Sequence, residues 1–141
     1  MPTLTKTRIN ATDMMTGVLA VVSHHGTTSL YHNTESLERA FYAASLHLVK
    51  RSEALGLNVR FAATPESTQV LPHTLYALAV SGLLTYFDGD ICLNTRNFSL
   101  VDLTKLPGSP ELYDELTKIF FSAYNHATPE ITRETAETAP Q

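Results

Sequence analysis

The residues of this chain that could do chemistry begin with three histidines, His24, His25 and His32. Together they could suggest a metal site, but zinc needs three or four converging ligands and further residues that orient them. Adjacent histidines at a helix end point in different directions, and basic groups are favourable near a helix C-terminus without any metal. The sequence therefore predicts no metal site.

The sequence does not indicate a catalytic site either. Cys92 is the only cysteine, and a lone cysteine without an activating signature is commonly a small buried hydrophobe. Asp88 and Asp90 flank Gly89 and could act as a carboxylate pair, but turn formation alone explains an Asp-Gly pair. Other carboxylates complement the dipole at a predicted helix start: Glu111, Asp114 and Glu115. Phosphate-binding loops and nucleophile elbows are missing too, so we predict no enzyme, no catalytic residue and no cofactor.

The composition is that of an ordinary globular protein. The 141 residues fit one domain, with 43% hydrophobic and 17% charged residues and a formal net charge of −4. Non-specific nucleic-acid affinity needs clustered Lys and Arg, which argues against a general polyanion binder. The most apolar run, residues 17–22, is far shorter than a membrane span, and no secretory signal is visible. We expect a cytoplasmic protein without membrane contact.

Apolar residues at helical spacing predict three long helices, each after a capping residue. They cover 13–24 after Thr12, 35–55 after Asn33 or Thr34, and 110–125 after Ser109. The first is apolar almost all round, which is typical of a buried helix. We expect residues 11–127 to form one domain, with a flexible arm over 1–10 and a disordered tail over 128–141.

Shorter elements are expected between the second and third long helices. Alternating apolar residues predict a strand over 57–61. Thr64-Pro65 is a helix start, and Pro72 both ends that short helix and begins another that runs to Ser81.

A hairpin is predicted to follow directly. Gly82 ends the helical pattern, and Asp88-Gly89 is the pair that a type I′ turn prefers. This loop pairs Phe87 with Asp90, Tyr86 with Ile91, Thr85 with Cys92 and Leu84 with Leu93. Because strand side chains alternate faces, one face is apolar: Leu84, Tyr86, Ile91 and Leu93.

The order of strand, short helix, turn, longer helix and hairpin resembles the winged helix-turn-helix superfamily over residues 57–98. The likeness rests on these residues: Leu75, Leu78, Gly82-Leu83-Leu84, Asp88-Gly89, Ile91 and Leu93. It implies a mostly helical α+β fold with a winged-helix-like unit and a small hairpin, flanked by further helices. In DNA-binding members of the family, the helix after the turn enters the major groove.

The sequence departs from a DNA-reading pattern in this unit. Residues 72–81 contain no Arg, Lys, Asn or Gln, the side chains that most often read base edges. Asp88 and Asp90 would bring negative charge to phosphates. A DNA-binding regulator remains the alternative, and its nucleic-acid contacts would come from scattered cations: Arg39, Lys50, Arg51, Arg60 and Arg96.

The favoured hypothesis is a non-enzymatic adaptor or accessory subunit of an intracellular bacterial or phage complex. Its partner would be another protein subunit, with a second copy of this chain as one option, and the isolated chain would bind nucleic acid weakly. Tyr and Phe are enriched at interfaces, so the candidate contacts are Tyr76, Phe87 and Tyr124.

Overall fold

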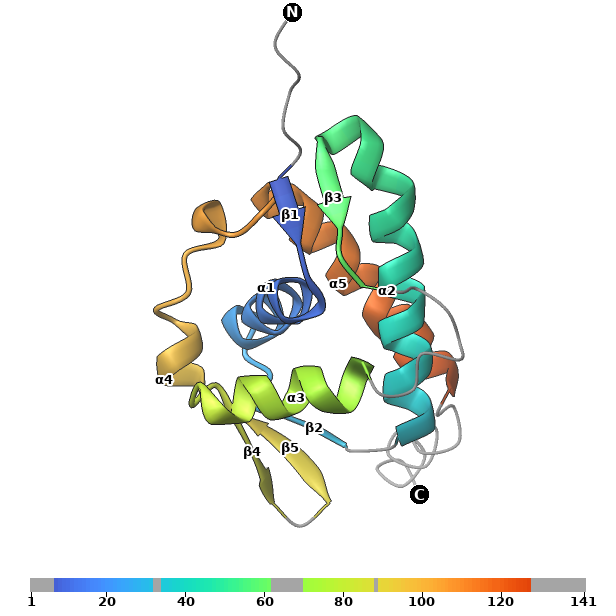
Figure 1. The fold of residues 1–141 in the computed structure, drawn as a ribbon. Coiled ribbons are helices and arrows are strands. Elements are labelled where there is room, and N and C mark those ends of the chain that lie inside the picture. Colours follow the sequence, from blue (N-terminus) through green and yellow to red (C-terminus); the bar gives the residue numbers. More distant parts are fainter. Residues whose placement is uncertain (1–6, 32–33, 62–69, 88, 128–141) are drawn as a thin grey trace, which may run out of the picture.

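The computed structural model describes residues 7–31, 34–61, 70–87 and 89–127. In chain order the elements are β1 (Thr7–Ile9), α1 (Ala11–His24), β2 (Ser29–Tyr31), α2 (Thr34–Leu55), β3 (Leu57–Val59), α3 (Val70–Val80), β4 (Leu84–Phe87), β5 (Asp90–Leu93), α4 (Thr95–Phe98), the 3₁₀ turn η1 (Leu103–Lys105) and α5 (Pro110–Ala127). The mostly helical α+β class predicted from the sequence is confirmed. Figure 1 shows α1 in the middle, α3 below it, and the β4–β5 hairpin projecting below α3.

Helix α1 is the centre of the core, as its all-round apolar sequence predicts. Its large apolar residues are all buried: Met14, Met15, Val18, Leu19, Val21 and Val22. The cap is Asn10, not Thr12 as the sequence analysis had it. Asn10 Oδ1 accepts the backbone N–H of Asp13 at 2.8 Å, and the Asp13 carboxylate accepts the backbone N–H of Asn10 at 3.1 Å. This reciprocal pair satisfies two otherwise unpaired helix-start donors.

Strand β1 corrects the prediction of a flexible arm over residues 1–10. Thr7–Ile9 pair in parallel with Leu57–Val59 of β3, and Ile9 is fully buried. One apolar side chain on a three-residue strand gives little periodicity to detect, and the partner strand lies about fifty residues away in sequence. Residues 1–6, the short helix expected from Thr64 and the tail from 128 lie outside the described residues.

Helices α2 and α5 pack against each other along one side of the molecule (Figure 1). The predicted inner face of α2 is buried throughout: Leu37, Ala40, Phe41, Ala44 and Leu48. On α5 the buried face includes Tyr113, whose ring lies against Gly17 of α1 so closely that a Cβ there would stand 2.1 Å from its Cδ1. The Tyr113 hydroxyl donates to the backbone oxygen of Pro107, and burial raises its pKa.

The predicted hairpin register is confirmed at all four pairs, from Leu84–Leu93 to Phe87–Asp90. Gly89 has a φ of 85°, which the turn requires. Strand β2 adds a third strand that the sequence analysis did not expect, giving the order β2-β5-β4. This third strand comes from outside residues 57–98, whereas β3 pairs with β1.

Helix α3 leads directly into the hairpin through a short turn at its C-terminal end. It begins at Val70, two residues before the predicted start at Pro72. Pro72 therefore lies in the first turn of the helix, where its missing backbone N–H breaks no helical hydrogen bond. The backbone N–H of Leu83 bonds Leu78 O at 2.9 Å, and that of Gly82 bonds Ala79 O at 3.0 Å. Gly82, with a φ of 81°, allows this closure.

Candidate protein-binding surface

The outer face of α3 is apolar and exposed. Its inward positions are buried: Leu71, Thr74, Leu75 and Leu78. On the opposite side Tyr76 is 70% exposed and Val80, one turn later, is 69% exposed. His73 is exposed one turn before Tyr76, and the whole helix carries no Lys, Arg, Asp or Glu. The helix therefore presents an uncharged apolar face to solvent.

The hairpin that α3 contacts adds exposed aromatic side chains near its turn. Phe87 is 72% exposed and Tyr86 is 49% exposed. The strand alternation predicts Tyr86 on the apolar face with Leu84, Ile91 and Leu93, and those three are buried. Tyr86 is exposed because it lies one pair from the turn, where the hairpin projects past the helices (Figure 1). Partial burial still raises the pKa of its phenol.

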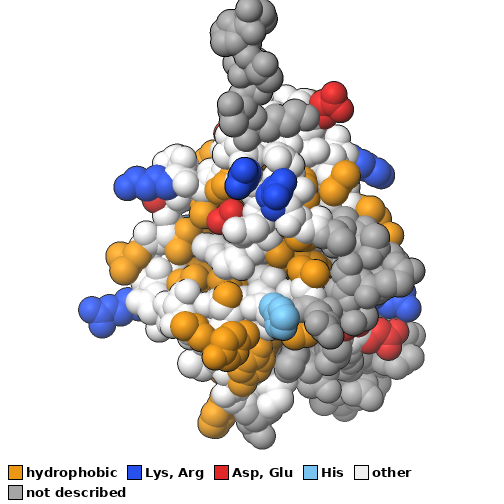
Figure 2. Space-filling model, viewed as in Figure 1, with side chains coloured by type: hydrophobic (Ala, Val, Ile, Leu, Met, Phe, Trp, Pro, Cys, Tyr) orange, Lys and Arg blue, Asp and Glu red, His pale blue; other side chains and the backbone are white. Residues whose placement is uncertain are grey.

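These exposed side chains lie on two neighbouring elements, which we treat as one candidate surface. Helix α3 contacts β4, and Figure 2 shows hydrophobic side chains gathered on the part of the molecule where α3 and the hairpin lie. We define Tyr76, Val80, Tyr86 and Phe87 as the α3–hairpin surface.

Tyr124, the third predicted contact, is not an exposed aromatic. It is only 9% exposed, and its ring stacks on that of Phe120 with centroids 6.5 Å apart. The ring of Phe121 meets it edge-on at 6.0 Å. Tyr124 follows Phe120 by four residues on α5, so it shares the buried face of that helix.

The five cations proposed as alternative nucleic-acid contacts do not converge on α3 or the hairpin. Arg39 Nη2 lies 3.3 Å from Glu35 Oε1 on the same helix. Arg51 Nε lies 3.2 Å from Glu115 Oε1 on α5. The remaining three are exposed on separate elements: Lys50 on α2, Arg60 after β3 and Arg96 in α4.

Sequence reasoning missed a polar cluster that joins α2 to α5. Glu115 Oε1 lies 2.9 Å from His47 Nε2 and accepts the Nε hydrogen of Arg51 at 3.2 Å. The hydrogen bond with His47, followed by that with Arg51, holds the pKa of the Glu115 carboxyl below its ordinary value. Glu111 and Asp114 are exposed in the first two turns of α5. Only the four-residue spacing of His47 and Arg51 was visible in the sequence.

The histidines and the cysteine considered for chemistry are dispersed. His24 Nε2 lies 3.2 Å from the backbone oxygen of Phe98, whereas His25 is the C-cap residue of α1 and lines a cavity. His32 lies outside the described residues. Cys92 is a half-buried free thiol in the middle of β5. Within the described ranges, no three His, Cys, Asp or Glu side chains stand close enough to hold a metal ion.

No helix in the described part of the chain combines the length and apolar character needed to cross a bilayer. Comparisons with models of protein families, with curated proteins and with solved structures found no match.

Proposed function

We propose that this chain is a non-enzymatic protein-binding subunit of an intracellular bacterial or phage assembly, and that it docks through the α3–hairpin surface. The observation that carries the proposal is the exposure of Tyr76 and Val80 on α3, and of Tyr86 and Phe87 near the tip of the hairpin whose strand β4 contacts α3. Single exposed apolar residues are common on proteins, but a group that includes Tyr and Phe is typical of an interface. A cytoplasmic location fits a chain whose one cysteine has no intrachain partner.

The chemistry of this surface favours a protein partner over a nucleic acid. Most protein–DNA hydrogen bonds go to phosphates and sugars, and Lys and Arg neutralise that backbone. Helix α3 supplies neither residue, and Asp90 flanks the turn. The resemblance to winged helix-turn-helix domains supports α3 and the hairpin as the contact unit, and Tyr76 and Val80 would then meet apolar side chains instead of base edges.

Site-specific photo-crosslinking tests the proposal in the native cell. A benzoylphenylalanine replaces Tyr76 in one variant and Phe87 in a second. A third variant carries it at Glu53, which is exposed near the end of α2, next to β3 and away from α3 (Figure 1). We expect the same discrete protein adduct from the first two positions and none from the third. The proposal is wrong if the adducts from all three positions are alike, or if Tyr76 and Phe87 yield no protein adduct.

A DNA titration with the purified chain distinguishes the protein-binding subunit from the alternative, a DNA-binding regulator. At about 150 mM salt, near the physiological ionic strength, we expect no sub-micromolar binding to duplexes of varied sequence. Sequence-dependent binding at sub-micromolar concentrations would replace the adaptor with a DNA-binding regulator.

A further inference from the structure

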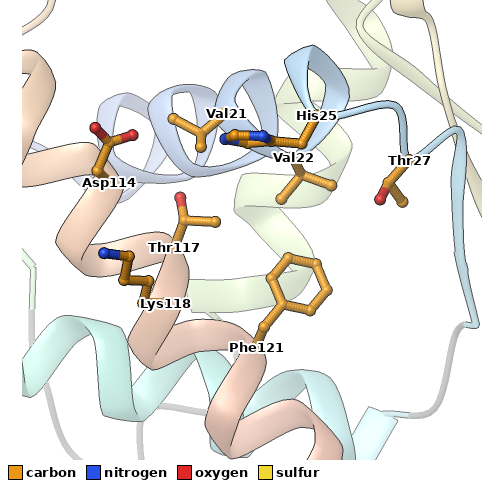
Figure 3. A pocket seen from close by; sticks show the side chains of 8 residues that line it. All are labelled: Val21, Val22, His25, Thr27, Asp114, Thr117, Lys118 and Phe121. Carbon is orange, nitrogen blue, oxygen red and sulfur yellow. The ribbon is translucent and has the colours of Figure 1, made fainter.

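A cavity separate from the α3–hairpin surface lies between the C-terminal end of α1 and the middle of α5. Its volume is about 530 Å³, within the range of roughly 300–1,000 Å³ that small-molecule sites occupy. It is lined by residues of both helices and of the segment after α1: Val21, Val22, His25, Thr27, Asp114, Thr117, Lys118 and Phe121. Figure 3 shows the side chains of α1 on one side of the gap and those of α5 on the other, with Thr27 on the segment that follows α1.

One end of the cavity is apolar. Val22 of α1 faces Phe121 of α5, with Thr27 beyond them (Figure 3). Val22 is buried and Phe121 is half-buried, so both side chains are held by the core and need little reordering to receive a ligand. An apolar group placed here would lose water contact against surfaces that are already formed.

The other end carries opposite charges. Asp114 and Lys118 are exposed one turn apart on α5, and Figure 3 places both at this end, with Thr117 between them and the His25 ring opposite. The salt bridges within the described ranges do not include an Asp114–Lys118 pair. Among the described residues, neither charge is therefore paired with another side chain, which leaves both for a ligand.

Thr117 adds a hydrogen-bond acceptor next to Asp114 at the charged end of the cavity. Its hydroxyl donates to the backbone oxygen of Tyr113 at 2.7 Å, so the oxygen offers its lone pairs to other donors. An ammonium group suits Asp114 and Thr117, and a carboxylate suits Lys118. A ligand with only an ammonium group would be repelled by Lys118, and a ligand with only a carboxylate would be repelled by Asp114.

We propose that this cavity binds a small zwitterion, with an ammonium and a carboxylate group at one end of an apolar body. The ammonium group pairs with Asp114 and Thr117, the carboxylate pairs with Lys118, and the body lies between Val22 and Phe121. An apolar α-amino acid has this chemistry. This inference is independent of the proposed protein-binding function, because it uses none of the same residues.

Three matched probes test the proposal on the unaltered chain by amide-resolved NMR titration: phenylalanine, 3-phenylpropanoate and phenethylamine. They share the phenyl body and differ in which charges they carry. We expect phenylalanine to bind tightest, with a millimolar Kd, and to shift the amides of Val22, Thr27 and Thr117. A charge pair at an exposed site is worth up to about 1 kcal/mol, or roughly fivefold in Kd. Each single-charge probe should therefore bind about three- to fivefold more weakly.

Two charge variants sharpen the test. Lys118→Gln should weaken phenylalanine and 3-phenylpropanoate about threefold, because it removes the carboxylate's partner. It should not weaken phenethylamine, because its ammonium group loses only a repelling charge. Asp114→Asn should weaken phenylalanine and phenethylamine about threefold, because it removes the partner of the ammonium group, and should not weaken 3-phenylpropanoate. Lys50→Gln, which removes an exposed cation of α2 outside the cavity, is the matched control and should change none of the three affinities.

The proposal is overturned if phenylalanine at concentrations well above a millimolar Kd shifts no cavity amide. It is equally overturned if either single-charge probe binds as tightly as phenylalanine, or if both charge variants affect the three probes alike.

Discussion

Helices α1 and α3 are both strongly apolar, yet the fold treats them differently. Helix α1 is buried around most of its circumference, with α3, α4 and α5 packed against it. Helix α3 buries one side and leaves Tyr76 and Val80 in water. Fully burying a large apolar side chain adds about 1.5–3 kcal/mol to the free energy of unfolding. Tyr76 and Val80 do not make this contribution in the isolated chain. Packing explains the sequence of α1, whereas on the outer face of α3 only the proposed protein partner would bury Tyr76 and Val80.

The largest expected effect is at the α1–α5 crossing. Gly17→Ala adds a Cβ that would stand 2.1 Å from Tyr113 Cδ1. Overpacking of about 3 kcal/mol, offset by about 1 kcal/mol of improved helix propensity, should lower the free energy of unfolding by roughly 2 kcal/mol in a urea titration. The double variant Gly17→Ala/Tyr113→Leu should recover part of this loss. Unchanged stability of the single variant would contradict the close approach of the two helices.

The next effect is at the hairpin turn. Gly89 has a φ of 85°, which a β-branched side chain resists, so Gly89→Val should lower the free energy of unfolding by about 1–3 kcal/mol. Gly89→Asn is the matched variant and should lose less, because Asn tolerates this conformation better. Equal losses for both variants would show that the turn conformation is not the cause.

A smaller effect is expected from the cluster between α2 and α5. The pKa of Glu115 is lowered in the folded state by His47 and Arg51, so its stabilising contribution is present above the ordinary carboxyl pKa. That contribution is lost as pH falls through the folded-state value. Glu115→Gln should therefore lower the Tm at neutral pH, and the difference from the unaltered protein should vanish in acid. Glu53→Gln, at an exposed carboxyl of α2, should show no such trend.

The smallest stability effect is expected on the α3–hairpin surface. Tyr76→Ser combined with Phe87→Ser should change the free energy of unfolding by no more than about 0.5 kcal/mol for each residue, as for most exposed positions. Both side chains are more than two-thirds exposed. A loss of several degrees in Tm would mean that they support the fold, and would remove the contrast with α1.

Sequence patterns predicted the hairpin and the long helices because their signals are local. The alternation from Leu84 to Leu93 and the Asp-Gly pair specify a register without reference to distant residues. Strands β1 and β2 have three residues each, and their pairing with β3 and β5 joins positions far apart in sequence. Three residues are too few to show the alternation of apolar and polar residues by which a strand is predicted.

The candidate surface was partly predictable for the same reason. Tyr76 lies opposite Leu75 and Leu78 in the helical pattern, and Phe87 lies on the polar face of the hairpin, so their exposure follows from periodicity. The error at Tyr124 was avoidable, because it follows buried Phe120 by one turn. The Glu115–His47 contact spans 68 residues, and the cavity between α1 and α5 depends on how two helices cross; neither can be inferred from spacing.

The most direct test of a protein-binding α3–hairpin surface measures the Phe87 photo-crosslink in a chain that also carries Tyr76→Ser. If Tyr76 and Phe87 contact one partner, the yield of the Phe87 adduct should fall several-fold while the Tm of the purified chain stays unchanged. An undiminished adduct in a chain with normal stability would contradict the account, because the two exposed aromatics would then not belong to one interface.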